Sequence, residues 1–154
     1  FLRQYLYLFL SQDVRERAMV RLVVHYLYGR LPRRRPLIRK VFAEILSNVI
    51  SLNDRVCGVD EILTVYNSIV CGFTLPIKEE HVHFLKHCIL PLHKLNGLME
   101  YSSTLSRCVL LFVTREASLC VPVRDSRLGD DLGDSGYCAL LAQIQFAVRD
   151  HGSG

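Results

Sequence analysis

Apolar residues recur at intervals of three and four along most of this chain, and this spacing most restricts its fold. One series runs Ile38, Val41, Phe42, Ile45, Leu46 and Val49, and a second runs Val59, Ile62, Leu63, Tyr66 and Val70. Such spacing places the apolar side chains on one face of an α-helix. No strand alternation or hairpin signal competes with it. The sequence therefore predicts an all-α protein.

Capping and helix-breaking residues mark where the first full helix begins and ends. Asp13 and Glu16 have the spacing of a capping box, which predicts a helix from about residue 14 to 28. Gly29 is expected to stop that helix in left-handed backbone.

The later helices are delimited in the same way. Pro36 suits the first turn of a helix, because its missing N–H would be unpaired there. That helix is expected to end near Leu52, and the next at Gly72. The segment GFTLP then connects two helices and is expected to tuck its apolar residues under them. Further helices are indicated by Val82, Leu85, Ile89 and Leu92, and by Leu105, Cys108, Val109 and Phe112.

The helix boundaries repeat along the chain. Gly29 and Gly72 stand 43 residues apart, and Pro36 and Pro76 stand 40 apart. Helical pairs of the HEAT and armadillo type have periods of about 40 to 47 residues. We therefore expect a HEAT/armadillo-like helical-repeat solenoid with one concave surface for partners. Because FLRQYLYLFL at the start reads as the middle of a helix, we interpret the chain as a fragment.

The cysteines and the hydropathy of the sequence indicate where in the cell the protein is expected. The six cysteines lie in apolar segments without a CxxC pair, which predicts reduced, buried side chains and a cytoplasmic or nuclear protein. No apolar run reaches the roughly 18 residues that span a bilayer, and no signal peptide is recognisable. We expect no membrane partner.

No motif points to catalysis. The sequence lacks GxSxG, a Gly-rich phosphate loop and a Cys-His signature. His83 and His87 stand one helical turn apart after Glu80, a spacing that in principle holds zinc, but the HExxH order of zinc hydrolases is absent. A solvated helix face is the simpler interpretation. We expect neither enzymatic activity nor a metal or cofactor.

The segment RLPRRRPLIRK, residues 30 to 40, carries six positive charges in a chain whose net charge is +4. It fits a nucleic-acid or nuclear-import patch, a dock for acidic peptides, or a solvated loop. It lacks the aromatic residues that stack on single-stranded bases, which disfavours binding of single-stranded nucleic acid. Composition alone favours the solvated loop.

Helical spacing adds a second interpretation. If successive pairs stack in register, one groove is lined by three sets: Arg21, His25 and Tyr28 leading into residues 33 to 35; Val65 and Ile69 at the edge of the core stripe; and Lys78 with His81. Such a groove has an apolar floor and basic rims. Spacing by itself favours the simpler interpretation, in which Val65 and Ile69 complete the core and the histidines lie on the surface.

Three motifs resemble a known family. HYLYGRLPRRRPLIRK (25 to 40), GFTLPIKEEH (72 to 81) and LPLHK (90 to 94), in this order and without insertions, are similar to the B-prime regulatory subunits of protein phosphatase 2A. The resemblance covers residues 1 to 123. It implies a HEAT-like solenoid without catalytic activity, whose full-length relatives bind the phosphatase scaffold and catalytic subunits.

The resemblance also implies a ligand. Family members capture substrates that carry a Leu-x-x-Ile-x-Glu sequence in a groove on the solenoid. The positions that match this groove are His25, Tyr28, Arg35, Val65, Ile69, Lys78 and His81. An acidic or phosphorylated peptide would meet the basic residues through charge-assisted hydrogen bonds.

The chain departs from the family in two places. Tyr26 stands where the family has an arginine, beside the position that receives the ligand's glutamate. Beyond Val123 the similarity stops, and we expect a flexible Gly/Asp-rich segment at 124 to 136, followed by a short helix and tail at 137 to 154. The alternative function is a helical-repeat adaptor or basic nucleic-acid-binding module that no longer associates with the phosphatase.

Overall fold

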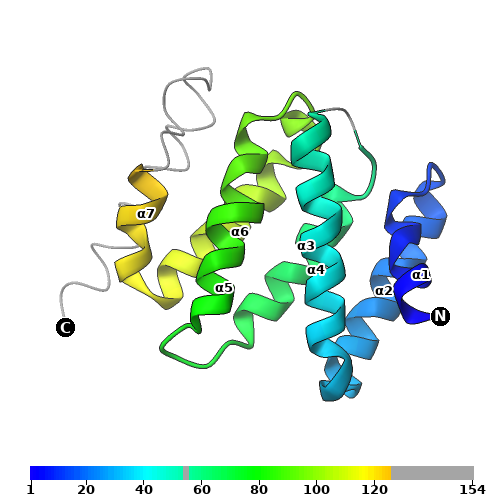
Figure 1. Ribbon diagram of the computed structural model, residues 1–154, viewed down its shortest axis with the longest axis horizontal. Helices are drawn as coiled ribbons and strands as arrows, with labels where there is room; N and C mark the ends of the chain where they lie inside the picture. The colour runs from blue at the N-terminus through cyan, green and yellow to red at the C-terminus, as the bar shows by residue number, and fades with distance from the viewer. Residues whose placement is uncertain (54–55, 126–154) are drawn as a thin grey trace.

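The computed structural model describes residues 1–53 and 56–125 and arranges their helices in two layers (Figure 1). One layer holds α1 (Leu2–Leu6), α3 (Arg35–Leu52) and α5 (Glu79–Phe84); the other holds α2 (Val14–Arg30), α4 (Val59–Cys71) and α6 (Ser102–Arg115), followed by α7 (Cys120–Asp125). Short turns η1 to η6 connect or extend them: Tyr7–Leu10, Pro32–Arg34, Leu85–Ile89, Leu90–Lys94, Leu98–Glu100 and Ala117–Leu119. Within the described ranges no residue is in a strand. The all-α, repeat-like prediction is confirmed.

The core lies between the two layers and is continuous along the solenoid. Neighbouring helices contact each other within a layer, α2 with α4 and α4 with α6, and this stacking buries the predicted apolar stripes. The Tyr66 ring of α4 is buried in this core and stacks on Phe84 at 4.3 Å and on Phe112 at 6.4 Å between centroids. Each helix pair is therefore stabilised by its neighbours rather than by a core of its own.

The start of α2 follows the prediction in part. The Asp13 carboxylate accepts a hydrogen bond from the Arg15 backbone N–H at 2.8 Å, as an N-cap residue should. The backbone N–H of Asp13 donates to Ser11 Oγ at 3.2 Å, the role that the capping box would give to Glu16. The helix start was predicted correctly, but half of its capping scheme was not.

The end of α2 corrects the prediction for Gly29. This glycine lies inside the helix and outside the left-handed region of backbone conformation. Pro32 supplies the reason for the helix end, because proline disfavours helical backbone in the residue before it. Leu31 accordingly has φ −118° and ψ 76°.

The boundaries of α3 and α4 confirm the sequence analysis. Pro36 lies in the first turn of α3, which ends at Leu52, and Gly72 follows the last residue of α4. Left-handed backbone occurs elsewhere, at Asn53 (φ 46°) after α3 and at Gly58 (φ 92°) before α4. The left-handed backbone that was predicted at Gly29 therefore occurs instead in the turn between α3 and α4.

The helix expected around Val82 to Leu92 is present but irregular. Regular α-helix ends at Phe84, a π-helical turn covers Leu85–Ile89, and 3-10 geometry continues over Leu90–Lys94. Pro91 has no N–H to donate to the preceding turn, so the regular hydrogen-bond ladder cannot pass it. The periodicity indicated the helix but not this change of geometry.

Two expectations about burial are only partly right. In the GFTLP connection Phe73 is half-buried and the following Ile77 is buried, but Leu75 is 60% exposed. Among the described cysteines, Cys88 and Cys108 are buried, Cys57 and Cys120 are intermediate, and Cys71 is exposed. Short apolar periods therefore overstate burial at the helix ends and connections.

The tail lies mostly outside the described residues. This applies to Cys138, to the segment expected to be flexible from 124 to 136 and to the short helix expected after it. Only residues 124 and 125 belong to the described part, as the end of α7.

Candidate functional site

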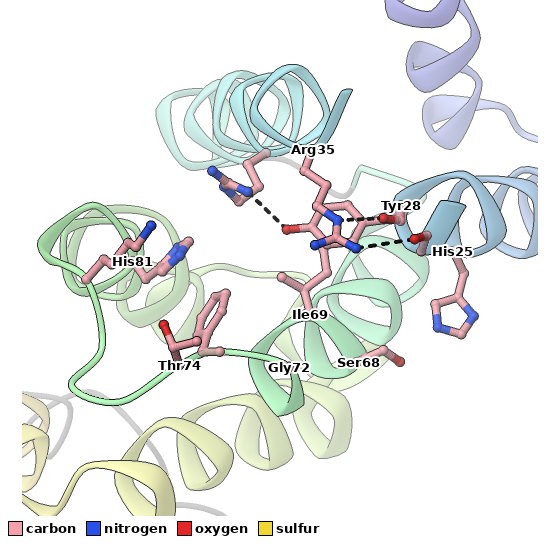
Figure 2. Close-up of a pocket in the computed structure, with 12 residues that line it drawn as sticks. His25, Tyr28, Arg35, Ser68, Ile69, Gly72, Thr74 and His81 are labelled. Carbon is pink, nitrogen blue, oxygen red and sulfur yellow. Dashed lines mark hydrogen bonds between the residues drawn. The ribbon is translucent and has the colours of Figure 1, made fainter. Parts of the chain in front are cut away.

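A cleft of about 400 Å³ opens where the C-terminal ends of α2 and α4 meet the N-terminal ends of α3 and α5. Figure 2 shows its walls, with His25, Tyr28 and Arg35 on one side, His81 on the other and Ile69 between them. We call it the α2–α5 groove. Its lining residues are His25, Tyr28, Gly29, Arg35, Arg39, Ser68, Ile69, Gly72, Phe73, Thr74, Lys78 and His81.

Six of the seven predicted site residues line this groove, and Val65 does not. Val65 is 1% exposed and belongs to the core between the layers. Ile69, one helical turn later on α4, is 4% exposed yet reaches the groove floor. For Val65 the simpler interpretation, that it completes the core, describes its position.

The Arg35 side chain fixes one wall by holding the end of α2. Its Nε donates to the Tyr28 carbonyl oxygen at 2.8 Å and its Nη2 to the Gly29 carbonyl oxygen at 3.2 Å. Carbonyls in the last helical turn have no partner within the helix, so Arg35 satisfies two of them. The guanidinium also lies over the Tyr28 ring, 5.3 Å from its centroid. Within the described chain no hydrogen bond uses its Nη1, which leaves that group for a ligand.

Arg39 is a groove residue that the sequence analysis did not select. It lies one turn after Arg35 on α3, and this i, i+4 spacing was the available signal. Its Nη1 donates to the Tyr28 hydroxyl at 3.1 Å, and its Nη2 donates to Glu80 at 3.3 Å. These two bonds tie α2, α3 and α5 together at the groove.

The opposite wall is the connection between α4 and α5, which the sequence analysis treated as a turn. The Phe73 ring stacks on the His81 imidazole with 3.8 Å between centroids. The last residue of α6 and the residue that follows it hold this connection in place. Arg115 Nη2 donates to the Phe73 carbonyl oxygen at 2.7 Å, and Glu116 accepts from the Ile77 backbone N–H at 2.8 Å.

The groove is electropositive. Among the described residues that line it none is acidic, while Arg35, Arg39 and Lys78 carry positive charge. Burial lowers the pKa of His81, and the positive charges of Arg39 and Lys78 lower it further, against an opposing effect of Glu80. His81 is therefore held in its neutral form, and an anion placed in the groove would favour its protonation.

The other candidate chemistry is not assembled. The His83 and His87 rings lie 4.1 Å apart, but no group of three or more His, Cys, Asp or Glu side chains is placed to hold a metal ion within residues 1–53 and 56–125. In the same ranges, no helix has the length and apolar character that crossing a bilayer requires.

A comparison with protein families finds one that matches most of the chain. The sequence profile of the protein phosphatase 2A regulatory B subunit (B56 family) matches residues 1–128. This range includes all the residues that line the groove.

Individual relatives agree with the profile. The chain is 43% identical over 119 residues to the B' delta isoform of the 55 kDa regulatory subunit of protein phosphatase 2A from Arabidopsis thaliana, covering 77% of this chain and 25% of that protein. It is 40% identical over 116 residues to the delta isoform of the human 56 kDa regulatory subunit, covering 75% and 19%. The alpha isoform of the human 56 kDa regulatory subunit is 37% identical over 123 residues, covering 80% of this chain and 25% of that protein. The chain thus spans about a quarter or less of the length of these relatives.

Proposed function

The chain belongs to the B56 family of protein phosphatase 2A regulatory B subunits, and from this premise we propose that its α2–α5 groove binds acidic peptides of the Leu-x-x-Ile-x-Glu type. In this proposal the protein is a non-catalytic subunit that brings substrates carrying such a sequence to the phosphatase. The observation that carries the proposal is the convergence of six predicted residues, from four helices and a connection, on one electropositive cleft.

The groove has the two kinds of surface that such a peptide needs. Ile69 and the Tyr28 ring offer apolar contacts for the two aliphatic side chains. Lys78 is exposed and has no hydrogen bond or ion pair from its ammonium group within the described residues, so it is available for an acidic side chain. Arg35 adds its Nη1 group. Charge-assisted hydrogen bonds of this kind are stronger than neutral ones and favour an acidic ligand.

Much of this site is ordered before a ligand arrives. Arg35 is held by two carbonyls, Arg39 by Tyr28 and Glu80, and His81 by its stacking on Phe73. Side chains that are fixed in advance lose little conformational entropy on binding. An extended peptide would therefore bear most of the ordering cost itself, which is consistent with a dissociation constant on the order of micromolar.

The test is a fluorescence titration with a labelled Leu-x-x-Ile-x-Glu peptide. Lys78→Glu is the most informative variant, because Arg35 also supports the end of α2 and its replacement would disturb the fold. We expect charge reversal at Lys78 to weaken binding at least tenfold, about 1.4 kcal/mol.

Lys86→Glu is the matched control, since Lys86 is an exposed lysine on the following η3 turn and does not line the groove. The affinity of Lys86→Glu for the peptide should stay within about twofold of that of the parent protein. Equal weakening by both variants would indicate a general charge effect and would remove the groove assignment.

We extend the proposal to partners and location. Association with the scaffold and catalytic subunits of the phosphatase is proposed from family membership and is tested by co-purification. A cytoplasmic or nuclear location is proposed because the five described cysteines are free thiols. Fractionation of cells that express the tagged chain tests it.

A further inference from the structure

A separate cleft, of about 470 Å³, opens between α4 and α6, which are neighbours in one helix layer. We call it the α4–α6 cleft. Ser68 and Cys71 line it from α4, and Ser103 and Arg107 line it from α6. Positions three or four apart lie on the same face of a helix, so one face of each helix forms a wall. The cleft has the size of those that hold small organic ligands.

Cys71, the last residue of α4, brings a thiol to this cleft. It is exposed, whereas the other four cysteines within the described ranges are not: Cys57, Cys88, Cys108 and Cys120. Burial raises the pKa of Cys88, Cys108 and Cys120, which keeps these thiols protonated. A thiol reacts as its thiolate and only where a reagent can reach it, so access favours Cys71 for reaction with a disulfide from solution.

A buried amide beside the thiol lacks a partner. Asn67 is 8% exposed and lines the cleft. Its Nδ2 donates to the Thr104 carbonyl oxygen at 3.4 Å, but its Oδ1 accepts no hydrogen bond from the described residues. Buried polar atoms normally have partners, so this oxygen indicates a place for an N–H group of a ligand.

The cleft also favours a negatively charged ligand. Arg107 is exposed, and no hydrogen bond or ion pair joins its guanidinium to another described residue. Among the described residues that line the cleft none is acidic. The hydroxyls of Ser68 and Ser103 are likewise without partners in the described ranges. A guanidinium of this kind pairs with a carboxylate through two parallel hydrogen bonds.

We propose that the α4–α6 cleft binds glutathione and that Cys71 forms a mixed disulfide with it. Glutathione is a small acidic peptide with two carboxylates, two amide N–H groups and a thiol between them. In the bound state Arg107 pairs with a carboxylate, Asn67 Oδ1 accepts from an amide N–H, and the serine hydroxyls bind the peptide carbonyls. The ligand sulfur is then held at Cys71.

The covalent step is thiol–disulfide exchange with glutathione disulfide. Cys71 loses its proton to solvent, and the thiolate attacks one sulfur of the disulfide. A bond forms between Cys71 Sγ and that sulfur while the original S–S bond breaks. The second glutathione leaves as a thiolate and takes up a proton, so the Cys71 sulfur is oxidised and the departing sulfur is reduced. An excess of reduced glutathione reverses the exchange.

The experiment treats the full chain with glutathione disulfide or with hydroxyethyl disulfide, which is neutral and has no amide group. Peptide mass spectrometry after acid quenching measures the rate at each cysteine. We expect Cys71 to react first among the five described cysteines. The ratio of its rates with the two reagents measures recognition of glutathione apart from thiol reactivity. Cys88 and Cys108 should stay unmodified in every folded variant, because both are buried.

Arg107→Gln tests the recognition. We expect the rate ratio at Cys71 to fall about fivefold in this variant, because a charge-assisted pair with the ligand is lost. Arg33→Gln is the control, since Arg33 is exposed and does not line the cleft, and its ratio should match that of the parent protein.

Three results would overturn the proposal. A Cys71 rate no higher than those of Cys57 and Cys120 would show that the cleft does not expose the thiol to the reagent. An unchanged ratio in Arg107→Gln would show that Cys71 reacts as an exposed thiol without recognition of glutathione. An equal fall in Arg33→Gln would assign the preference to the net charge of the protein.

Discussion

Arg115, the last residue of α6, donates a hydrogen bond from Nη2 to the carbonyl oxygen of Phe73, 42 residues earlier in the chain and 2.7 Å away. The next residue, Glu116, accepts from the Ile77 backbone N–H, so both ends of the α4–α5 connection are held from one place. Since Phe73 in turn stacks on His81, a wall of the groove depends on the neighbouring helix pair. Groove and solenoid stacking are therefore coupled.

This coupling predicts a remote effect on binding. Arg115→Gln should weaken binding of the Leu-x-x-Ile-x-Glu peptide by about three- to tenfold, because the shorter side chain cannot hold the Phe73 carbonyl and the wall loses its fixed position. Peptide titration of the folded variant measures it. Arg107→Gln, an exposed position on the same helix that lies outside the groove, is the control. Unchanged affinity in Arg115→Gln would show that the connection is held without this bond.

The sequence predicted the elements of the fold well, because each helix of the two layers buries a regular apolar stripe. It misplaced details that depend on contacts between elements. The end of α2 was assigned to Gly29 although Pro32 determines it, and Val65 was placed at the groove although α4 turns it into the core. Helical spacing predicts on which face of a helix a side chain lies, with an error of about one residue position. The packing of the neighbouring helices decides whether a side chain at the edge of that face lies in the core or in the groove.

In the α2–α5 groove, too, the contacts between helices could not be predicted from local sequence. Local motifs supplied six of its seven predicted residues, but the bonds that make it rigid join residues far apart in sequence. The ion pair of Arg39 with Glu80 spans 41 positions, and the hold of Arg115 on Phe73 spans 42. No local pattern predicts such pairs, because they arise when successive helix pairs stack.

Two glycines are predicted to respond oppositely to a methyl group. At Gly58, φ is 92° and an added Cβ would collide with the Phe9 carbonyl group, so Gly58→Ala should destabilise the protein by about 2 kcal/mol or more. At Gly29, inside α2, a Cβ meets nothing within 4 Å, so Gly29→Ala should stabilise it by about 0.5 to 1 kcal/mol. Denaturant unfolding of both variants measures the difference. A neutral Gly58→Ala would contradict the left-handed turn before α4.

Peptide affinity is predicted to rise as the pH falls from 7.5 to 5.5. The pKa of His81 lies below its usual value in the free protein, chiefly because of burial, so the imidazole is neutral at pH 7.5. An acidic ligand favours the protonated ring, and binding must therefore become stronger as the pH approaches that lowered pKa. We expect about a threefold gain, measured by titration at constant ionic strength.

The variant His81→Gln should abolish most of this pH dependence. Its affinity will be lower at every pH because the stacking on Phe73 is altered, so the slope against pH is the informative quantity. His25→Gln, on the opposite wall, is the comparison. A slope that disappears in His25→Gln and persists in His81→Gln would assign the effect to the other wall.

Stability is predicted to change with pH through His93. This residue is 5% exposed, its Nδ1 lies 3.1 Å from the Leu90 carbonyl oxygen, and its Nε2 has no partner within the described chain. Burial lowers its pKa in the folded state, whereas the unfolded chain regains the ordinary value near 6.5. Below that pH the unfolded state binds more protons than the folded state. The contribution of His93 to the free energy of unfolding is therefore complete above about pH 6.5 and is lost as the pH falls.

The urea midpoint should therefore decrease between pH 7.5 and pH 5 more in the parent protein than in His93→Phe. Phenylalanine keeps an aromatic ring in the buried position and cannot titrate, although it loses the bond to Leu90. The readout is the difference between the two pH values within each variant, which cancels any constant cost of the substitution. An equal decrease in both proteins would assign the acid sensitivity to other groups, of which His81, also buried and with a lowered pKa, is the first to replace.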